Sequence, residues 1–249
     1  MRHRRKFGLI GKNIEYSFSR KYFLEKFSSD INLKGYNYEN FDIESINLIN
    51  SFISDKNLGG LNVTIPYKEE IIPYLDALSD EAKEIGAVNT ICFENNKKIG
   101  YNTDIFGFTE SLKVNSINNI KAMIIMGTGG AAKTIIYFCK KNKITFNVVS
   151  RRNSKDYLSY SDIDHSFFKG NVLIVNCTPV GTYPNINKCP DLPYNLLEKE
   201  NIIYDLVYNP AETLFIKKGK EIGCKTLNGY EMLKFQAEMS WNLWSKSLK

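Results

Sequence analysis

The chain has 249 residues, of which 43% are hydrophobic and 24% charged, as expected for a globular protein with its own core. The net charge is +6, but the dense basic run is confined to the N-terminus, and no aromatic-interleaved basic patch indicates a nucleic-acid binder. No run reaches the roughly 18 apolar residues of a membrane span or the roughly 7–15 of a signal peptide, so we expect a cytoplasmic protein.

The first hundred residues alternate short apolar runs with helical patterns, which predicts an α/β sheet. We expect strands at Lys6–Ile10, Tyr36–Asn40, Gly60–Thr64, Val88–Phe93 and Lys98–Tyr101. We expect helices at Arg20–Phe27 with Ser19 as the cap, at Ile43–Ile53, and at Tyr67–Leu75, where Pro66 suits a helix start.

The second half reads as a βαβ unit followed by more strands. A helix at Ile105–Val114 precedes it, with Asp104 near the helix start. The unit consists of a strand at Ala122–Met126, a helix at Lys133–Lys141 and a strand at Thr145–Ser150. Further strands are predicted at Val172–Cys177, Ile202–Val207 and Lys225–Leu227, and a long final helix at Tyr230–Leu248.

The loop of the βαβ unit indicates dinucleotide binding. Gly127-x-Gly129-x-x-Ala132 fits the GxGxxG/A pattern, and a strand precedes it while a helix follows. Small residues let the backbone turn tightly and approach a pyrophosphate, while the helix N-terminus supplies free N–H groups. A plain glycine turn is the alternative. The predicted contacts are Gly127, Thr128, Gly129, Gly130 and Ala131.

The end of the second strand of this unit indicates which cofactor binds. Folds that bind NAD place Asp or Glu there to hold the ribose 2′-hydroxyl. This chain has Ser150-Arg151-Arg152, and a guanidinium can grip a 2′-phosphate through paired, charge-assisted hydrogen bonds. Arg151 and Arg152 therefore favour NADP, although two exposed arginines on a basic protein are the simpler reading.

Several polar motifs in the first half lie at strand ends. Asn62 and Thr64 precede Lys68, whose positive charge would be unfavourable in the first turn of a helix, and such a broken local rule often marks a functional site. Asn89 lies at a strand start, and Asp104 follows a strand and precedes a helix. Taken singly, Lys68 reads as a surface lysine and Asp104 as a helix cap.

Eight motifs, in order, resemble those of the shikimate dehydrogenase family over nearly the whole length of the chain. They are Ser17-Phe18-Ser19, Asn62-Val63-Thr64-x-Pro66-x-Lys68, Gly86–Thr90, Asn102-Thr103-Asp104, Gly127–Ala132, Asn176-Cys177-Thr178-Pro179-Val180-Gly181, Asp205-x-x-Tyr208-Asn209-Pro210 and Gly229-x-x-Met232-Leu233-x-x-Gln236-Ala237. Each motif is moderately specific, and the set is very specific.

The resemblance implies reversible, NADPH-dependent reduction of 3-dehydroshikimate to shikimate in aromatic amino-acid (chorismate) biosynthesis. It implies a substrate domain at 1–103, a Rossmann-like NADP domain at 104–229 and a final helix at 230–249 that returns to the first domain. The chain would then be an oxidoreductase that acts on small molecules as a monomer or homodimer.

The resemblance also assigns roles to single residues. Lys68 and Asp104 match the catalytic pair, and Ser17 and Ser19 match residues that bind the substrate carboxylate. Leu206 and Gly229 match contacts to the nicotinamide half of the cofactor. The positions implied to face the substrate or contact its hydroxyls are Asn62, Thr64, Asn89, Asp104, Tyr208 and Gln236.

The chain departs from the family pattern in a few places. The usual His before the first serine is Tyr16, the usual Pro after the second is Arg20, and the loop reads GTGGA rather than GAGGA. Ser150-Arg151-Arg152 replaces the usual Asn-Arg-Thr. No departure touches the implied catalytic pair.

Two rival functions use the same fold. A quinate/shikimate dehydrogenase, which could be linked to NAD, would favour Thr at the position of Ser19 and an acid at the position of Arg151. A non-catalytic, cofactor-sensing regulator would have lost Lys68 or Asp104. No metal is expected, because the five cysteines are scattered without CxxC spacing and both histidines lie outside the motifs.

Overall fold

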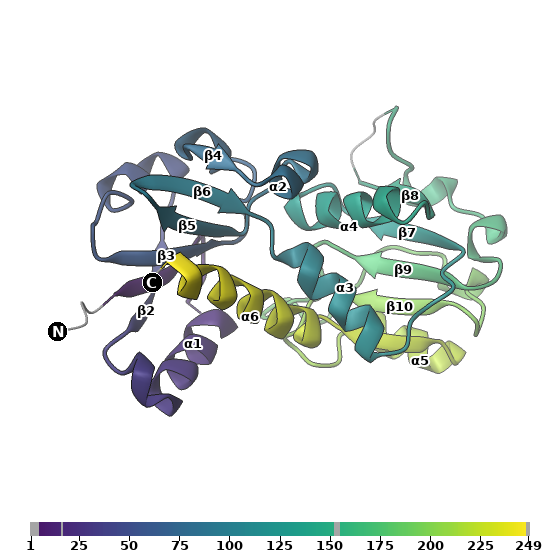
Figure 1. Cartoon of the computed structure of the whole chain (residues 1–249). Coiled ribbons are helices and arrows are strands. Elements are labelled where there is room, and N and C mark those ends of the chain that lie inside the picture. Colours follow the sequence, from purple (N-terminus) through teal and green to yellow (C-terminus); the bar gives the residue numbers. More distant parts are fainter. Residues whose placement is uncertain (1–4, 16, 152–154, 248–249) are drawn as a thin grey trace. The chain divides into compact units, whose positions relative to one another are not determined.

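Two separate β-sheets organise the chain (Figure 1). The computed structural model describes residues 5–15, 17–151 and 155–247. The chain divides into unit 1, Met1–Thr103 with Ala237–Lys249, and unit 2, Asp104–Gln236. Each unit contains one sheet, so the expected α/β fold class is confirmed.

Unit 1 contains a mixed six-stranded sheet with the strand order β2-β1-β3-β5-β6-β4. Its central strand β1 is parallel to β2 and β3, whereas β5 is antiparallel to both β3 and β6. The strands are β1 (Lys6–Gly11), β2 (Asn37–Asp42), β3 (Leu58–Val63), β4 (Ala77–Leu78), β5 (Thr90–Glu94) and β6 (Lys97–Tyr101).

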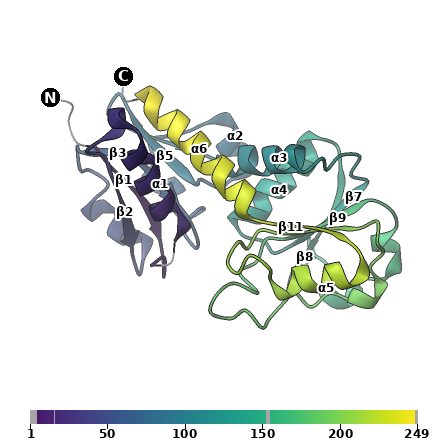
Figure 2. The same cartoon turned by 90° about the horizontal axis from the view of Figure 1, so that it is seen from below.

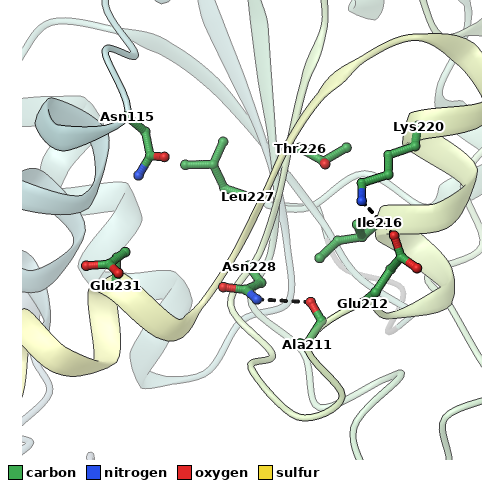
Figure 3. A pocket seen from close by; sticks show the side chains of 9 residues that line it. All are labelled: Asn115, Ala211, Glu212, Ile216, Lys220, Thr226, Leu227, Asn228 and Glu231. Carbon is green, nitrogen blue, oxygen red and sulfur yellow. Dashed lines mark hydrogen bonds and ion pairs between the residues drawn. The ribbon is translucent and has the colours of Figure 1, made fainter.

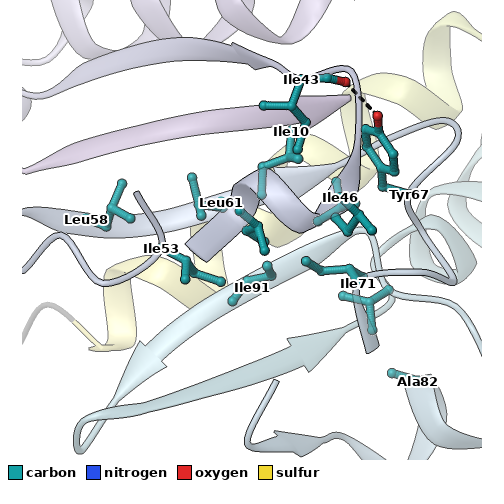
Figure 4. Close-up of a cluster of buried hydrophobic side chains, with 13 residues drawn as sticks. Ile10, Ile43, Ile46, Ile53, Leu58, Leu61, Tyr67, Ile71, Ala82 and Ile91 are labelled. Carbon is teal, nitrogen blue, oxygen red and sulfur yellow. Dashed lines mark hydrogen bonds between the residues drawn. The ribbon is translucent and has the colours of Figure 1, made fainter. Parts of the chain in front are cut away.

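Side chains of unit 1 pack on both faces of this sheet. Ile10 of β1 joins a cluster with Leu61 and Ile91 that a short 3₁₀ helix and the turn around Tyr67 help to form (Figure 4). Phe7 of the same strand joins the opposite cluster, because successive side chains of a strand point to opposite faces.

The end of the final helix completes the second cluster of unit 1. Trp244 is fully buried against Phe7 and Phe23, and its indole N–H donates to the Ile91 carbonyl over 3.0 Å. A buried tryptophan with its polar atom satisfied is a strong anchor, and truncating such a residue to alanine typically costs about 3–5 kcal/mol.

Unit 2 contains an all-parallel sheet with the strand order β11-β10-β9-β7-β8. If the five strands are numbered by their order in the chain, they lie side by side in the order 2-1-3-4-5. This is one of the two common strand orders of doubly wound sheets. The strands are β7 (Ala122–Met126), β8 (Thr145–Val149), β9 (Val172–Asn176), β10 (Ile202–Asp205) and β11 (Lys225–Asn228).

The helices α3 (Asp104–Val114), α4 (Gly130–Lys141) and α5 (Leu214–Ile222) cover the two faces of the second sheet (Figure 2). On one face, the Tyr204 hydroxyl donates to Ser111 of α3 over 2.7 Å, and Phe108 of α3 packs edge-on against Phe138 of α4. On the other face, Ile203 shares a buried cluster with Phe215 of α5. A parallel sheet buried in this way reads in sequence as continuous apolar runs, which is why its strands could be predicted.

The helices differ more from expectation than the strands do. The α-helices are α1 (Phe18–Ser29), α2 (Asp80–Ile85), α3 (Asp104–Val114), α4 (Gly130–Lys141), α5 (Leu214–Ile222) and α6 (Tyr230–Ser247). The 3₁₀ helices are Ile31–Leu33, Ile46–Ser51, Ile72–Tyr74, Tyr160–Asp162, His165–Phe168 and Tyr194–Leu196. The sequence patterns did not predict α2 or α5.

Two helices that the sequence predicts in unit 1 are not α-helices in the structure. The segment Tyr67–Leu75 forms turns and ends in the 3₁₀ helix Ile72–Tyr74. Pro73 has no N–H to donate within an α-helix, which disfavours the predicted helix here. The segment Ile43–Ile53 is helical only at Ile46–Ser51, as a 3₁₀ helix. Asparagine and serine within that segment are weak helix formers.

Candidate active site

The first helix presents two serines at its N-terminus. Ser17 is the N-cap of α1, and its hydroxyl accepts a hydrogen bond from the Ser19 backbone N–H over 3.2 Å. The predicted cap at Ser19 was therefore two residues late, and Ser19 is instead a helical residue that is 7% exposed. The positive end of a twelve-residue helix with two hydroxyls suits a carboxylate.

Lys68 lies in the turn that replaces the predicted helix, so its position at a helix N-terminus was wrong. Its backbone is nevertheless fixed, because its carbonyl accepts from the Val88 N–H over 2.7 Å. The neighbouring Tyr67 is buried, and its hydroxyl donates to the Ile43 carbonyl over 2.6 Å. Lys68 and Thr64 are both half-buried, so each retains some exposure to solvent.

Asn89 is held by the end of β6. Its side-chain oxygen accepts from the Thr103 backbone N–H over 2.6 Å, and its amide donates to the Thr103 hydroxyl over 2.9 Å. These two bonds fix the orientation of the Asn89 amide, and Asn89 is only 3% exposed. Thr103 directly precedes Asp104, so the same contacts order the chain that leads to that carboxylate.

Asn62 faces the strand that follows Asn89. The register of the antiparallel pair places Asn62 of β3 opposite Thr90 of β5. The Asn62 amide lies 3.2 Å from the Thr90 hydroxyl and 3.2 Å from the Asn89 carbonyl. Only 4% of Asn62 is exposed, so it is a buried polar residue with partners rather than a surface group.

Asp104 is the first residue of α3 and 5% exposed. An acid in the first turn of a helix is favourable, since it faces the positive end of the helix dipole. Two further candidates lie in unit 2. Gln236 of α6 is 7% exposed and donates to the Leu233 carbonyl over 2.8 Å, while Tyr208 is half-buried in the segment after β10.

The glycine loop has the geometry that a pyrophosphate requires. Gly127 follows β7 with φ of +112°, a conformation that favours glycine, and a side chain there would come 3.1 Å from Thr178 after β9. Helix α4 begins at Gly130, and none of the described side chains caps it at Gly129, around which a Cβ would meet nothing within 4 Å. Its N–H groups are thus available to an anion.

The loop lies at the point where a doubly wound sheet binds ligands. Strands β7 and β9 are neighbours in the sheet. The strand that follows β7 in the chain, β8, lies on one side of this pair, and the strand that follows β9, β10, lies on the other side. Ligands of open α/β sheets bind at this topological switch point, outside the carboxyl ends of the strands. Thr128 and Ala131, the other predicted loop contacts, are half-buried there.

Arg151 also lies at the carboxyl edge of the sheet, two residues past the end of β8, and is exposed. Its neighbour β8 pairs with β7, the strand that leads into the glycine loop. An exposed guanidinium can make paired, charge-assisted hydrogen bonds to a phosphate. Arg152 lies outside the described residues.

Leu206 and Gly229 lie directly against each other. A Cβ on Gly229 would overlap the Leu206 carbonyl, and the Gly229 N–H donates to Val207 over 3.2 Å. Only glycine fits, because the backbone after β11 passes directly against the backbone after β10. This contact explains why a glycine precedes the final helix.

A buried carboxylate beneath these segments was not predicted as functional. Asp205 ends β10 and accepts hydrogen bonds from Asn176 at 2.9 Å, Val207 at 3.0 Å and Thr213 at 2.6 Å. Desolvation raises its pKa to about 6, although these hydrogen bonds oppose the shift. Asn176 in turn accepts from the Thr178 hydroxyl over 2.6 Å. The sequence offered these residues only as parts of motifs, with no role.

A solvent-open pocket in unit 2 holds none of the predicted site residues (Figure 3). It lies between α5, β11 and the start of α6, and the ion pair between Lys220 and Glu212 at 2.6 Å borders it. Among the described residues, no group of three or more His, Cys, Asp or Glu side chains could hold a metal ion. In the same portion of the chain, no helix is long and apolar enough to cross a membrane.

The fold and these groups define a class of protein. A doubly wound parallel sheet with a glycine loop at its switch point is the architecture of dinucleotide-binding domains, here joined to a second α/β unit rich in buried polar groups. Residues 9–91 match the family model for the shikimate dehydrogenase substrate binding domain. The chain belongs to the shikimate dehydrogenase family.

Relatives and solved structures support this membership. The chain is 39% identical to shikimate dehydrogenase (NADP⁺) of Methanococcus vannielii, with 96% of the chain and 90% of the relative covered. It is 40% identical to that of Clostridium beijerinckii, with 96% and 92% covered. The crystal structure of shikimate dehydrogenase 1 from Peptoclostridium difficile matches the chain with a TM-score of 0.87. That of shikimate 5-dehydrogenase from Thermus thermophilus, in complex with NADP(H) and shikimate, matches it with a TM-score of 0.86. Their identities are 37% and 28%, over 98% and 97% of the chain and 92% and 94% of theirs.

Proposed function

We propose that this protein is an NADP-dependent shikimate dehydrogenase that reversibly reduces 3-dehydroshikimate to shikimate. The observation that carries the proposal is the match over 96% of the chain to relatives named for this activity. Three structural features support the proposal: the glycine loop, the N-terminus of α4 and Arg151. Together they provide groups that can bind the phosphates of NADP.

Several residues are proposed to bind the substrate. Ser17 and Ser19 would hold its carboxylate at the positive end of α1, where helix N–H groups and hydroxyls favour an anion. The residues proposed to face the ring or contact its hydroxyls are Asn62, Thr64, Asn89, Asp104, Tyr208 and Gln236. Amides, hydroxyls and a carboxylate can each donate to or accept from a ring hydroxyl.

The chemistry needs a proton and a positive charge at the reacting oxygen. When bound, NADPH supplies the hydride. Lys68 would donate a proton to the ketone oxygen as negative charge develops there, and its positive charge would stabilise that oxygen until the proton is transferred. Asp104, the other member of the proposed catalytic pair, would contact a substrate hydroxyl. The fixed backbone of Lys68 limits the positions that its ammonium group can reach.

The remaining cofactor contacts are proposed from the same geometry. The backbone of Gly127, Thr128, Gly129, Gly130 and Ala131 would hold the pyrophosphate, and Arg151 with Arg152 would hold the 2′-phosphate. Leu206 and Gly229, whose backbones approach each other closely, would contact the nicotinamide half.

We also propose a separate function for each of three parts of the chain. Residues 1–103 would bind the substrate, residues 104–229 would bind NADP, and the final helix at 230–249 would complete the substrate domain. The burial of Trp244 within unit 1 supports the last assignment. A monomer or homodimer in the cytoplasm is the proposed working form, with small molecules as its only partners.

Steady-state kinetics with four reactant pairs tests this function. The purified protein is given shikimate or quinate with NADP⁺ or NAD⁺, and the reduced nicotinamide is followed by its near-ultraviolet absorbance. We expect the highest kcat/KM for shikimate with NADP⁺. A higher value for quinate would indicate the quinate/shikimate dehydrogenase. Tight NADP⁺ binding without turnover of either acid would instead indicate a cofactor-sensing regulator.

A further inference from the structure

A buried hydrogen-bond network runs through unit 1 and joins residues that the proposed function assigns to the substrate. It begins at Tyr38 of β2. The Tyr38 hydroxyl donates to the side-chain oxygen of Asn62 over 2.8 Å. Tyr38 is fully buried, and its ring stacks on Phe23 with centroids 4.6 Å apart, so its hydroxyl has little freedom to move.

The network continues from Asn62 to the final helix. The Asn62 amide donates to the Ser240 hydroxyl over 3.0 Å, and Ser240 lies 2.8 Å from the Thr90 hydroxyl and 3.1 Å from the Thr103 hydroxyl. Ser240 is fully buried on α6, one turn beyond Gln236. Thr103 then holds the Asn89 amide over 2.9 Å.

The direction of each bond makes the network specific. Tyr38 has one proton to donate, and it goes to Asn62, so Tyr38 decides which way round the Asn62 amide lies. The other end of that amide must then face the hydroxyls of Ser240 and Thr90. Removing the Tyr38 hydroxyl takes away the donor to the buried Asn62 side-chain oxygen, and removing the Ser240 hydroxyl takes away one of the three acceptors near the Asn62 amide nitrogen.

We propose that Tyr38 and Ser240 are positioning residues for the substrate site, holding Asn62 and Asn89 in the orientation that binds the substrate. This inference rests on the proposed function. Neither residue needs to touch the substrate, and neither belongs to the sequence motifs that indicate the family.

The test removes one hydroxyl at a time. Tyr38→Phe and Ser240→Ala keep the backbone and most of the packing, and each is expected to raise the KM for shikimate by about two- to tenfold, the equivalent of one net hydrogen bond. The KM for NADP⁺ should stay within a factor of about two of the wild type, because the network lies in unit 1. A shikimate KM unchanged in both variants would overturn the inference.

Tyr204→Phe is the matched control. Tyr204 is also fully buried, donates to a serine hydroxyl over 2.7 Å and stacks on a phenylalanine at 5.5 Å, but it lies in unit 2 and contacts α3. It should lower the melting temperature as much as Tyr38→Phe does while leaving the KM for shikimate unchanged. An equal rise in that KM would show that the loss of any buried hydroxyl has this effect, and would overturn the assigned role.

The wild type separates this inference from the proposed function. If the wild type fails to oxidise shikimate, the proposed function fails before any variant is compared, and the inference fails with it. If the wild type is active and the variants bind shikimate as it does, only the positioning role fails. Calorimetric titration of shikimate into each folded variant measures that binding without relying on turnover.

Discussion

The buried carboxyl group of Asp205 should make the stability of the native protein depend on pH. Burial raises its pKa from 3.8 to about 6, so the native state binds this proton more tightly than the unfolded state does. The contribution of Asp205 to stability is therefore complete below about pH 3.8 and is lost as the pH rises through about 6. At about 1.4 kcal/mol per pH unit, the loss is about 3 kcal/mol.

Asp205→Asn isolates this effect, because asparagine has the same shape and cannot ionise. We expect the free energy of unfolding of the variant, relative to the wild type, to increase by up to about 3 kcal/mol between about pH 4 and about pH 7. Denaturant unfolding at a series of pH values, with a constant m-value as the check on two-state behaviour, measures this difference.

Asp162→Asn provides the opposite case. Hydrogen bonds from Ser159 lower the pKa of this exposed carboxyl group, so its contribution to stability is present above its unfolded pKa and lost as the pH falls. The Asp162→Asn variant should therefore lose stability relative to the wild type as the pH rises.

The test of Asp205 has a clear contrary outcome. If the difference in the free energy of unfolding between Asp205→Asn and the wild type stays constant over the same pH range, the raised pKa of Asp205 is refuted.

Three further predictions concern kinetics. Lys68→Ala should lower kcat by about 10²–10⁴-fold, the usual value of general acid catalysis, and retention of more than about a tenth of wild-type kcat would exclude the assigned role. Ser17→Ala should raise the KM for shikimate more than it lowers kcat, since a carboxylate contact far from the reacting carbon is similar in ground and transition states; a fall in kcat alone would argue against it. Arg151→Ala should reduce the preference for NADP⁺ over NAD⁺, measured as a ratio of kcat/KM, by about 10–150-fold, and an unchanged ratio would place the 2′-phosphate elsewhere.

The strands of unit 2 could be predicted to within a residue or two. Each is a short apolar run bounded by polar or glycine residues, and the parallel sheet buries both of its faces. The long final helix was also expected, and α6 covers Tyr230–Ser247 of the described residues. Signals that depend on hydrophobic pattern alone were therefore reliable here.

The short helices could not be predicted from that pattern. Helix α2 has six residues and α5 has nine, too few to establish a helical period. Both carry capping residues, with Ser79 and Gly86 around α2 and Thr213 and Gly223 around α5, and these were the signals that could have found them.

The site shows the same division between local and tertiary information. The glycine loop was predictable because its chemistry is written in consecutive residues, and its strand and helix appear where expected. The partners of Asn62 were not, because Tyr38, Thr90 and Ser240 reach it from three different elements. Only the strand order and the packing of α6 bring them together. A buried tyrosine or serine looks, in sequence, like any other residue of an amphipathic pattern.

The most direct test of the proposed activity follows the hydrogen that the reaction transfers. Shikimate carrying deuterium on the carbinol carbon that becomes the ketone is incubated with the protein and NADP⁺, and the reduced cofactor is analysed by mass spectrometry. Direct hydride transfer predicts that the deuterium appears in NADPH, with one 3-dehydroshikimate formed for each cofactor reduced. Deuterium lost to water, or no reduced cofactor at all, would contradict the account.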